Sequence, residues 1–175
     1  MLLALILLVL LPVSAWAQAP RMPEPEQSRP WAVYFAPDAG AQAVVEAIGR
    51  ARKSVRVQTV ALTSPPIAEA LVEAHQRGVS VEVIVNGKVP KGRVAAAPSL
   101  ARAGIAVLSD RAHAPVGGMA VIDRQVVLTG AFSFAAGPDN ASAENLLVIS
   151  DAGLAARYTE NWQAHAAHSV RPSGH

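Results

Sequence analysis

The sequence predicts an α/β fold, an α/β/α sandwich with a mixed, mostly parallel β-sheet. Three observations support this fold class. Short β-branched runs alternate with segments whose apolar residues recur at helical spacing, and this strand–helix order repeats three times. Two apolar runs around a polar turn then indicate a β-hairpin. Repeated strand–helix units favour parallel strands covered on both faces, and the hairpin adds antiparallel pairing.

The first half of the chain contains the three strand–helix units. Aromatic and β-branched runs favour strands, a hydroxyl residue followed by proline favours a helix start, and glycine favours a helix end. The expected strands are Trp31–Phe35, Val55–Leu62 and Val79–Val85. The expected helices are one that ends near Arg52, one from Thr63-Ser64-Pro65-Pro66 to Gly78, and one at Ala95–Ala103. A loop is expected at Lys88–Arg93.

The second half begins with a fourth strand and continues into the hairpin. Asp123-Arg124-Gln125 forms the polar turn of that hairpin, and a buried strand and a C-terminal helix follow. The expected elements are Ile105–Leu108, the hairpin strands Met119–Ile122 and Val126–Thr129, the strand Leu146–Ile149 and the helix Leu154–Ala167.

The N-terminus is predicted to be a cleaved signal peptide, residues 1–17. Leu2–Val13 is apolar but short for a membrane span, and Ala15-Trp16-Ala17 is a cleavage pattern. An uncleaved anchor is the alternative, since no Lys or Arg precedes the apolar run. We expect a flexible linker at 18–30, one domain at 31–169, a tail at 170–175 and no transmembrane domain after cleavage.

The composition indicates where the protein is located in the cell but not what reaction it catalyses. The chain has no cysteine, so an exported form has no disulfides and depends on packing. With the short signal and many alanines, this predicts secretion to a bacterial periplasm. The formal net charge of +2 neither favours nor excludes a polyanionic partner.

With these elements in place, the chain resembles the phospholipase D superfamily, and in particular its small, single-motif, exported bacterial endonucleases. The resemblance runs from Val33 to Trp162. Its matching stretches are residues 63–75, Gly78-Val79, Ala103-Gly104-Ile105, Val121-Ile122-Asp123, Leu128-Thr129-Gly130 and residues 143–149.

The resemblance implies a metal-free phosphodiesterase that acts on nucleic acid or phospholipid and needs no cofactor. The family motif reads His-x-Lys, four residues, Asp, six residues, Gly-Ser-x-Asn. Its His attacks phosphorus, its Lys and Asn hold the phosphoryl oxygens, and a second His comes from the partner subunit of a dimer. A neutral imidazole is a competent nucleophile, and a fixed cation stabilises the developing charge.

The motif is degenerate in this chain. Anchored on Asp123 and Gly130, its spacing is intact, but the reactive residues are replaced. The replacements are Val116 for His, Gly118 for Lys, Ala131 for Ser and Ser133 for Asn. Loss of the nucleophile removes most of the rate when catalytic groups act as a unit.

Some residues of the motif region retain a possible role at the site. Glu144 could orient a histidine of a partner, and Ser133 could donate a hydrogen bond to phosphate. The backbone amides of Gly130 and Ala131 could bind an anion. Asp123 has two equally weighted interpretations, a site residue or a turn residue bonded to local amides.

Three histidines and a lysine outside the motif are candidates for replacement chemistry. His113 precedes Val116 by three residues and is a candidate displaced nucleophile, with Lys88 as the cation; a solvated loop is the blander interpretation of both. His165 and His168 are spaced as a metal pair, but no carboxylate or cysteine nearby in sequence completes a set. The sequence therefore predicts a solvated helix face and no metal site.

The sequence thus predicts an exported phospholipase D-like domain with impaired catalysis. It would bind a phosphate-bearing ligand or pair with a partner, as a homodimer or as a heterodimer with an intact relative. The alternative is an active phosphodiesterase or endonuclease that uses His113.

Overall fold

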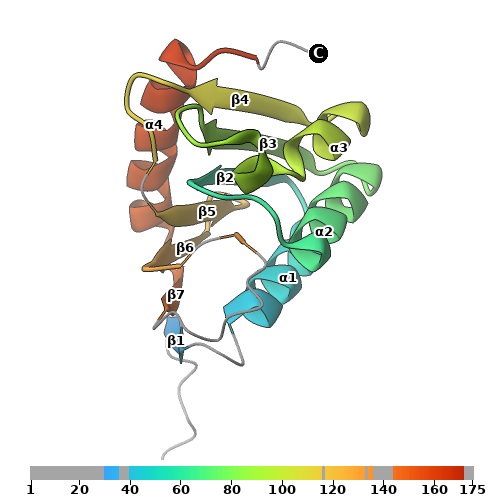
Figure 1. The fold of residues 1–175 in the computed structure, drawn as a ribbon. Helices are drawn as coiled ribbons and strands as arrows, with labels where there is room; N and C mark the ends of the chain where they lie inside the picture. Colours follow the sequence, from blue (N-terminus) through green and yellow to red (C-terminus); the bar gives the residue numbers. More distant parts are fainter. Residues whose placement is uncertain (1–29, 36–39, 116, 133, 136–143, 172–175) are drawn as a thin grey trace, which may run out of the picture.

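Seven strands form one sheet, and helices cover both of its faces (Figure 1). The computed structural model describes residues 30–35, 40–115, 117–132, 134–135 and 144–171. The strand order is β1-β7-β6-β5-β2-β3-β4. The predicted mixed α/β sheet with flanking helices is confirmed. The strands are β1 (Trp31–Phe35), β2 (Ser54–Thr59), β3 (Ser80–Asn86), β4 (Ala106–Asp110), β5 (Gly118–Ile122), β6 (Val126–Gly130) and β7 (Asn145–Ser150).

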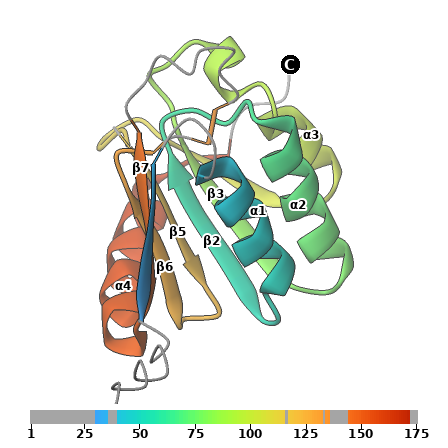
Figure 2. The ribbon, with the colours of Figure 1, turned by 90° about the horizontal axis from the view of Figure 1, so that it is seen from below.

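The helices divide between the two faces of the sheet (Figure 2). The helices are α1 (Gly40–Arg50), α2 (Pro65–Gln76), α3 (Ala97–Arg102), α4 (Ala152–His168) and the short 3-10 helix η1 (Lys91–Val94), which lies in the predicted loop. α1, α2 and α3 lie on one face, and α4 lies on the other. The predicted signal peptide, residues 1–17, and all of the predicted linker 18–30 except Pro30 lie outside the described residues.

Parallel pairing is confined to one side of the sheet, which corrects one detail of the prediction. β2 pairs with β3 and β3 with β4 in parallel, whereas the other four pairings are antiparallel. The expectation of a mostly parallel sheet rested on the three strand–helix units. The first of these units does not add a parallel neighbour, because β1 pairs antiparallel with β7 at the far edge of the sheet.

The two faces bury cores of different size. Under α1, α2 and α3 the core includes Val44, Ile48, Leu71 and Leu100, none of which is exposed to solvent. Full burial of such a side chain contributes about 1.5–3 kcal/mol to folding. Under α4 the cluster is smaller and has Val121, Val127 and Ala155 at its centre.

α4 crosses the sheet diagonally, and this path decides which side chains meet. Asp151 caps the helix by accepting a hydrogen bond from the Leu154 N–H at 2.7 Å. Further along, Tyr158 donates to Thr129 of β6, and the Trp162 indole donates to the Val57 carbonyl of β2. The last turn of the helix therefore reaches β4, the other edge strand of the sheet.

The chain beyond α4 also contacts β4. Val170 belongs to the segment expected to be a tail, yet its backbone exchanges two hydrogen bonds with Ser109. This antiparallel bridge holds the end of α4 against the sheet. Among the described residues, none of the helices has the length and apolar character needed to cross a membrane.

Candidate functional site

The predicted site lies at one end of the sheet, which we call the carboxyl end. β2, β3, β4 and β6 finish there, and β5 and β7 begin there. Gly118 pairs with both Thr59 and Gly130, and Asn86 pairs with Asp110. In α/β sheets ligands bind beyond the carboxyl ends of parallel strands, so this end is the natural place for chemistry.

Gly118, at the position that the resemblance assigns to the phosphate-binding Lys, is closed in by backbone. The residue is buried, and a Cβ added to it would lie 2.5 Å from the Phe132 carbonyl oxygen. The same Cβ would lie 3.0 Å from the ring of Phe134, which is 1% exposed. Any side chain here therefore requires the segment after β6 to move.

The backbone angle and close neighbours of residue 130 also require glycine at that position. Its φ of +140° is disfavoured for other residues, and an added Cβ would lie 2.4 Å from the Asn145 carbonyl oxygen. The Ala131 N–H, predicted to bind an anion, donates to Asn145 Oδ1 at 3.3 Å. The turn after β6 is thus bonded to the start of β7.

Three further predicted residues belong to this region. Val116 and Ser133 lie outside the described residues. Glu144 immediately precedes β7 at the carboxyl end and is partly buried. The structure therefore brings Gly118, Gly130, Ala131 and Glu144 to one end of neighbouring strands.

Asp123 lies at the opposite end of the sheet, in the turn between β5 and β6. Asp123 and Arg124 have φ values of 53° and 57°, as in the tight turns that connect hairpin strands. The Asp123 carboxylate accepts hydrogen bonds from the N–H groups of Arg52, Lys53 and Ser54 at 2.7–2.9 Å. Of the two interpretations, the turn role accounts for these contacts.

Those amides also govern the charge of Asp123. Burial acts to raise the pKa of its carboxyl, but the three N–H donors and the nearby Lys53 charge outweigh burial and lower the pKa below its ordinary value of 3.8. The ionised carboxylate therefore ties the hairpin to the start of β2.

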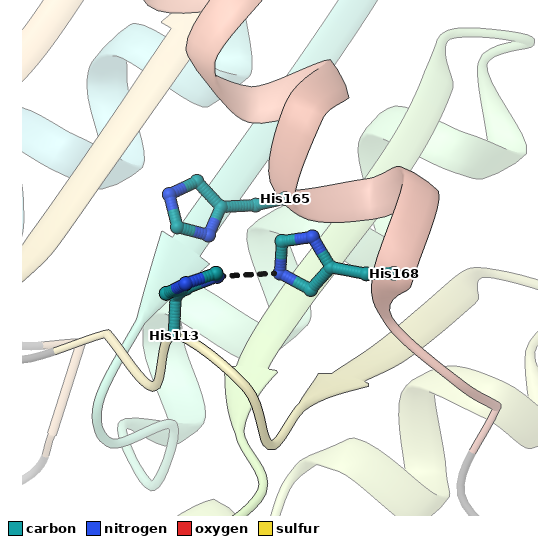
Figure 3. Close-up of side chains that lie close together, drawn as sticks. All are labelled: His113, His165 and His168. Atoms are coloured by element: carbon teal, nitrogen blue, oxygen red, sulfur yellow. Dashed lines mark hydrogen bonds between the residues drawn. The ribbon is translucent and has the colours of Figure 1, made fainter.

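A second polar group, the His–Asp cluster, consists of Asp110, His113, His165 and His168. Asp110 ends β4 and is fully buried, whereas His113 lies in the loop after it. His165 and His168 belong to the last turn of α4, and their rings face that of His113 (Figure 3). Segments more than fifty residues apart in sequence thus meet at the carboxyl end of β4.

Asp110 connects all the members of the cluster. Its Oδ1 accepts from the His113 backbone N–H at 2.8 Å, and its Oδ2 lies 2.8 Å from His165 Nδ1 and 3.1 Å from His168 Nε2. His113 Nδ1 and His168 Nε2 are 3.4 Å apart. Burial acts to raise the pKa of Asp110, but hydrogen bonds from His165, the His113 backbone and His168 outweigh it and lower the pKa to about 2.

This arrangement differs from the predicted solvated helix face. The side chains of His165 and His168 are 21% and 34% exposed, and both contact a carboxylate. Asp110 was missed because it is distant in sequence from these histidines. A signal was present, since Asp110 follows a predicted strand and precedes His113 by three residues.

The structure places His113 beside Asp110 and the last turn of α4. In the sheet, β2 and β3 separate β4 from β5. Lys88, the predicted cation, is exposed on the loop after β3. That loop is anchored by Asn86, which accepts from the Lys88 N–H and donates to the Pro115 carbonyl, both at 2.8 Å.

Comparisons with known proteins agree with the predicted family and fold. Residues 44–166 match the family model described as cardiolipin synthase, PLD-like domain. A phospholipase D of Rickettsia felis is 35% identical over 133 residues, which cover 73% of this chain and 65% of that protein. This chain therefore spans just under two thirds of the length of that relative.

Two solved structures are similar as well. The crystal structure of Nuc from Salmonella typhimurium, a phospholipase D family member, has a TM-score of 0.76 and 28% identity, with 82% of this chain and 98% of Nuc covered. NucT from Helicobacter pylori has a TM-score of 0.66 at 18% identity, with 81% of this chain and 98% of NucT covered, which shows a shared fold. With its sheet order, its motif spacing and these matches, the chain belongs to the phospholipase D-like family.

Proposed function

We propose that this protein is an exported phospholipase D-like domain that does not cleave phosphodiesters at its own motif and instead acts as a partner subunit for a second phospholipase D-like chain. The main support for the proposed loss of catalysis is the crowding around Gly118. A cation at this position would stabilise charge on the phosphoryl oxygens, but the Phe132 carbonyl lies where its side chain must begin.

The role as a partner rests on the exposed face of β1. Trp31, Val33 and Phe35 alternate along this edge strand and are 48%, 40% and 66% exposed. Tyr34, between them, packs against the main core, so the exposed side chains lie on the same face of the sheet as α4. Contiguous apolar side chains on an edge strand are typical of an interaction surface.

This apolar face leads directly to the candidate site. Phe35 pairs with Asn145, whose side chain accepts from the Ala131 N–H. A partner seated on β1 would therefore lie beside the degenerate motif. The resemblance implies that a partner subunit supplies a second His to the motif, and a partner beside the motif agrees with that arrangement.

The loss of catalysis is tested on the mature chain in EDTA, with DNA and a chromogenic phosphodiester as substrates. We expect no turnover above that of a mock purification. We also expect Val116→His with Gly118→Lys to gain nothing, because the lysine stem has no room. Turnover by the unaltered chain would overturn the proposal, and its loss in His113→Ala would establish the alternative of a displaced nucleophile.

Pairing is tested by light scattering on the same preparation, alone and mixed with an intact relative. Phe35→Asp should weaken any dimer, since it places a charge on the apolar face. Thr59→Ser, a buried change away from β1, is the matched control. A chain that stays monomeric under both conditions would contradict the partner role.

A further inference from the structure

We propose that His113, His165 and His168 form a binding site for a divalent transition metal ion, with zinc as the ion that this donor set suits best. One ring nitrogen from each histidine lies within 4.8 Å of the other two. Three imidazoles are a frequent zinc donor set and leave a fourth position for water or substrate. The site is separate from the degenerate motif and does not depend on the function proposed above.

The spacing of the nitrogens is close to that of a metal centre. Two ligands at about 2.05 Å in tetrahedral geometry lie about 3.3 Å apart. His113 Nδ1 and His168 Nε2 are already 3.4 Å apart. The remaining separations of up to 4.8 Å close by small side-chain rotations, and His113, on an exposed loop, is free to make them.

The protonation pattern of the cluster also favours an added cation. A neutral imidazole has one N–H, yet His168 Nε2 faces both Asp110 Oδ2 and His113 Nδ1. A metal ion satisfies the lone pairs of all three rings at once.

Asp110 supplies the negative charge that such a centre requires. It is fully buried and lies 2.8 and 3.1 Å from ring nitrogens of His165 and His168. His165 Nδ1 can donate to Asp110 and leave Nε2 for the ion, the arrangement in which a carboxylate orients a metal-binding ring and raises its basicity. His168 Nε2 faces Asp110 directly, so it would exchange this contact for the metal ion. Imidazole donors also select zinc-like ions over magnesium and calcium, which prefer oxygen ligands.

The position of the site indicates what the metal would do. It would join the loop after β4 to the last turn of α4, two segments from distant parts of the chain. The side chains of His113 and His168 are exposed, so water could reach the remaining coordination position. The proposal therefore includes a water-accessible centre as well as a cross-link.

The experiment uses tag-free mature protein stripped with EDTA and then dialysed. Zinc is titrated by calorimetry, and the melting temperature is measured with zinc or with magnesium. We expect one zinc per chain and a rise in melting temperature of roughly 5–10 °C when zinc exceeds the dissociation constant about a hundredfold. Magnesium at the same concentration should have no effect.

Variants assign the ligands. His113→Ala should fold normally, because the His113 ring is exposed. Asp110→Asn should lower the affinity for zinc about tenfold to hundredfold. His113→Ala should lower it further. His75→Ala is the matched control, since it removes a described histidine that is not part of the cluster, and it should bind zinc like the original chain. If His165→Ala fails to fold, cobalt(II) spectra of the unaltered chain report nitrogen ligands and coordination number directly.

Three outcomes would overturn the proposal. The first is absence of zinc binding at micromolar concentration. The second is an equal loss of zinc binding in His75→Ala and His113→Ala. The third is a stoichiometry of one zinc per two chains, with dimerisation that accompanies zinc binding. The last would assign the metal to a contact between surfaces of two molecules.

Discussion

The carboxyl end of the sheet contains two regions built in opposite ways. At the start of β5, Gly118, the position of the family's Lys, is enclosed by the Phe132 carbonyl and the ring of Phe134. At the end of β4, three imidazoles gather around a buried carboxylate. One region lost its polar side chains and closed, whereas the other is polar and open to water.

The difference shows that one end of a sheet can hold both a closed, apolar region and a polar region with exposed side chains. Closing the first region needed only small residues, because Gly118 and Gly130 allow neighbouring backbone to approach. Assembling the second needed α4 to cross the sheet and end beside β4. Each region can be disturbed separately, and the following changes are ordered by expected effect.

Gly130→Ala should have the largest effect on stability. The residue has a φ of +140°, and the new Cβ would lie 2.4 Å from the Asn145 carbonyl oxygen. Backbone strain and overpacking together should lower the free energy of unfolding by about 3 kcal/mol or more. Urea denaturation followed by circular dichroism measures this, and a loss below 1 kcal/mol would mean that the turn after β6 is looser than described.

Gly118→Ala should come next, with a loss of about 2–3 kcal/mol from overpacking against the Phe132 carbonyl. Gly117→Ala is the matched control, because its Cβ would meet only the Gly130 carbonyl at 3.7 Å. The control should differ from the original chain by less than about 0.5 kcal/mol. Equal losses in the two variants would show that the position of the motif Lys is not specifically closed.

Asp110→Asn measures how much the His–Asp cluster contributes to the free energy of unfolding in the absence of metal. With EDTA present, loss of the charged hydrogen bonds to His165 and His168 should cost about 2 kcal/mol. Asparagine keeps the shape and one oxygen for the His113 N–H, so the change reports charge more than packing. A variant as stable as the original chain would show that the cluster contributes nothing to folding without a metal.

Asp123→Asn should have the smallest effect, about 1 kcal/mol at neutral pH, since asparagine also accepts the left-handed backbone. The folded-state pKa of Asp123 lies below 3.8, so its contribution is complete above that value and is lost as the pH falls through the lower folded-state pKa. Unfolding curves of both chains between pH 7 and pH 2 should converge in acid. A gap that persists at pH 2 would contradict the role of the ionised carboxylate.

Much of the fold was predictable because the residue pattern of each segment favours the secondary structure that the segment has in the fold. The hairpin turn at Asp123 and the helix start at Pro65 follow from residue types alone. The degenerate motif was also readable, since its spacing is linear in sequence. The pairing of β1 with β7 was not, because strand order depends on which long-range contacts bury the most surface.

The sequence by itself determined the family, the fold class and the loss of the motif residues, since each depends on residue types at short, regular spacings. Only the tertiary structure decided that Gly118 is closed and that Asp110 meets three histidines. Both depend on contacts between segments far apart in the chain. Such contacts follow from the path of α4 across the sheet and the approach of Phe132 to β5, neither of which has a periodic signature in the sequence.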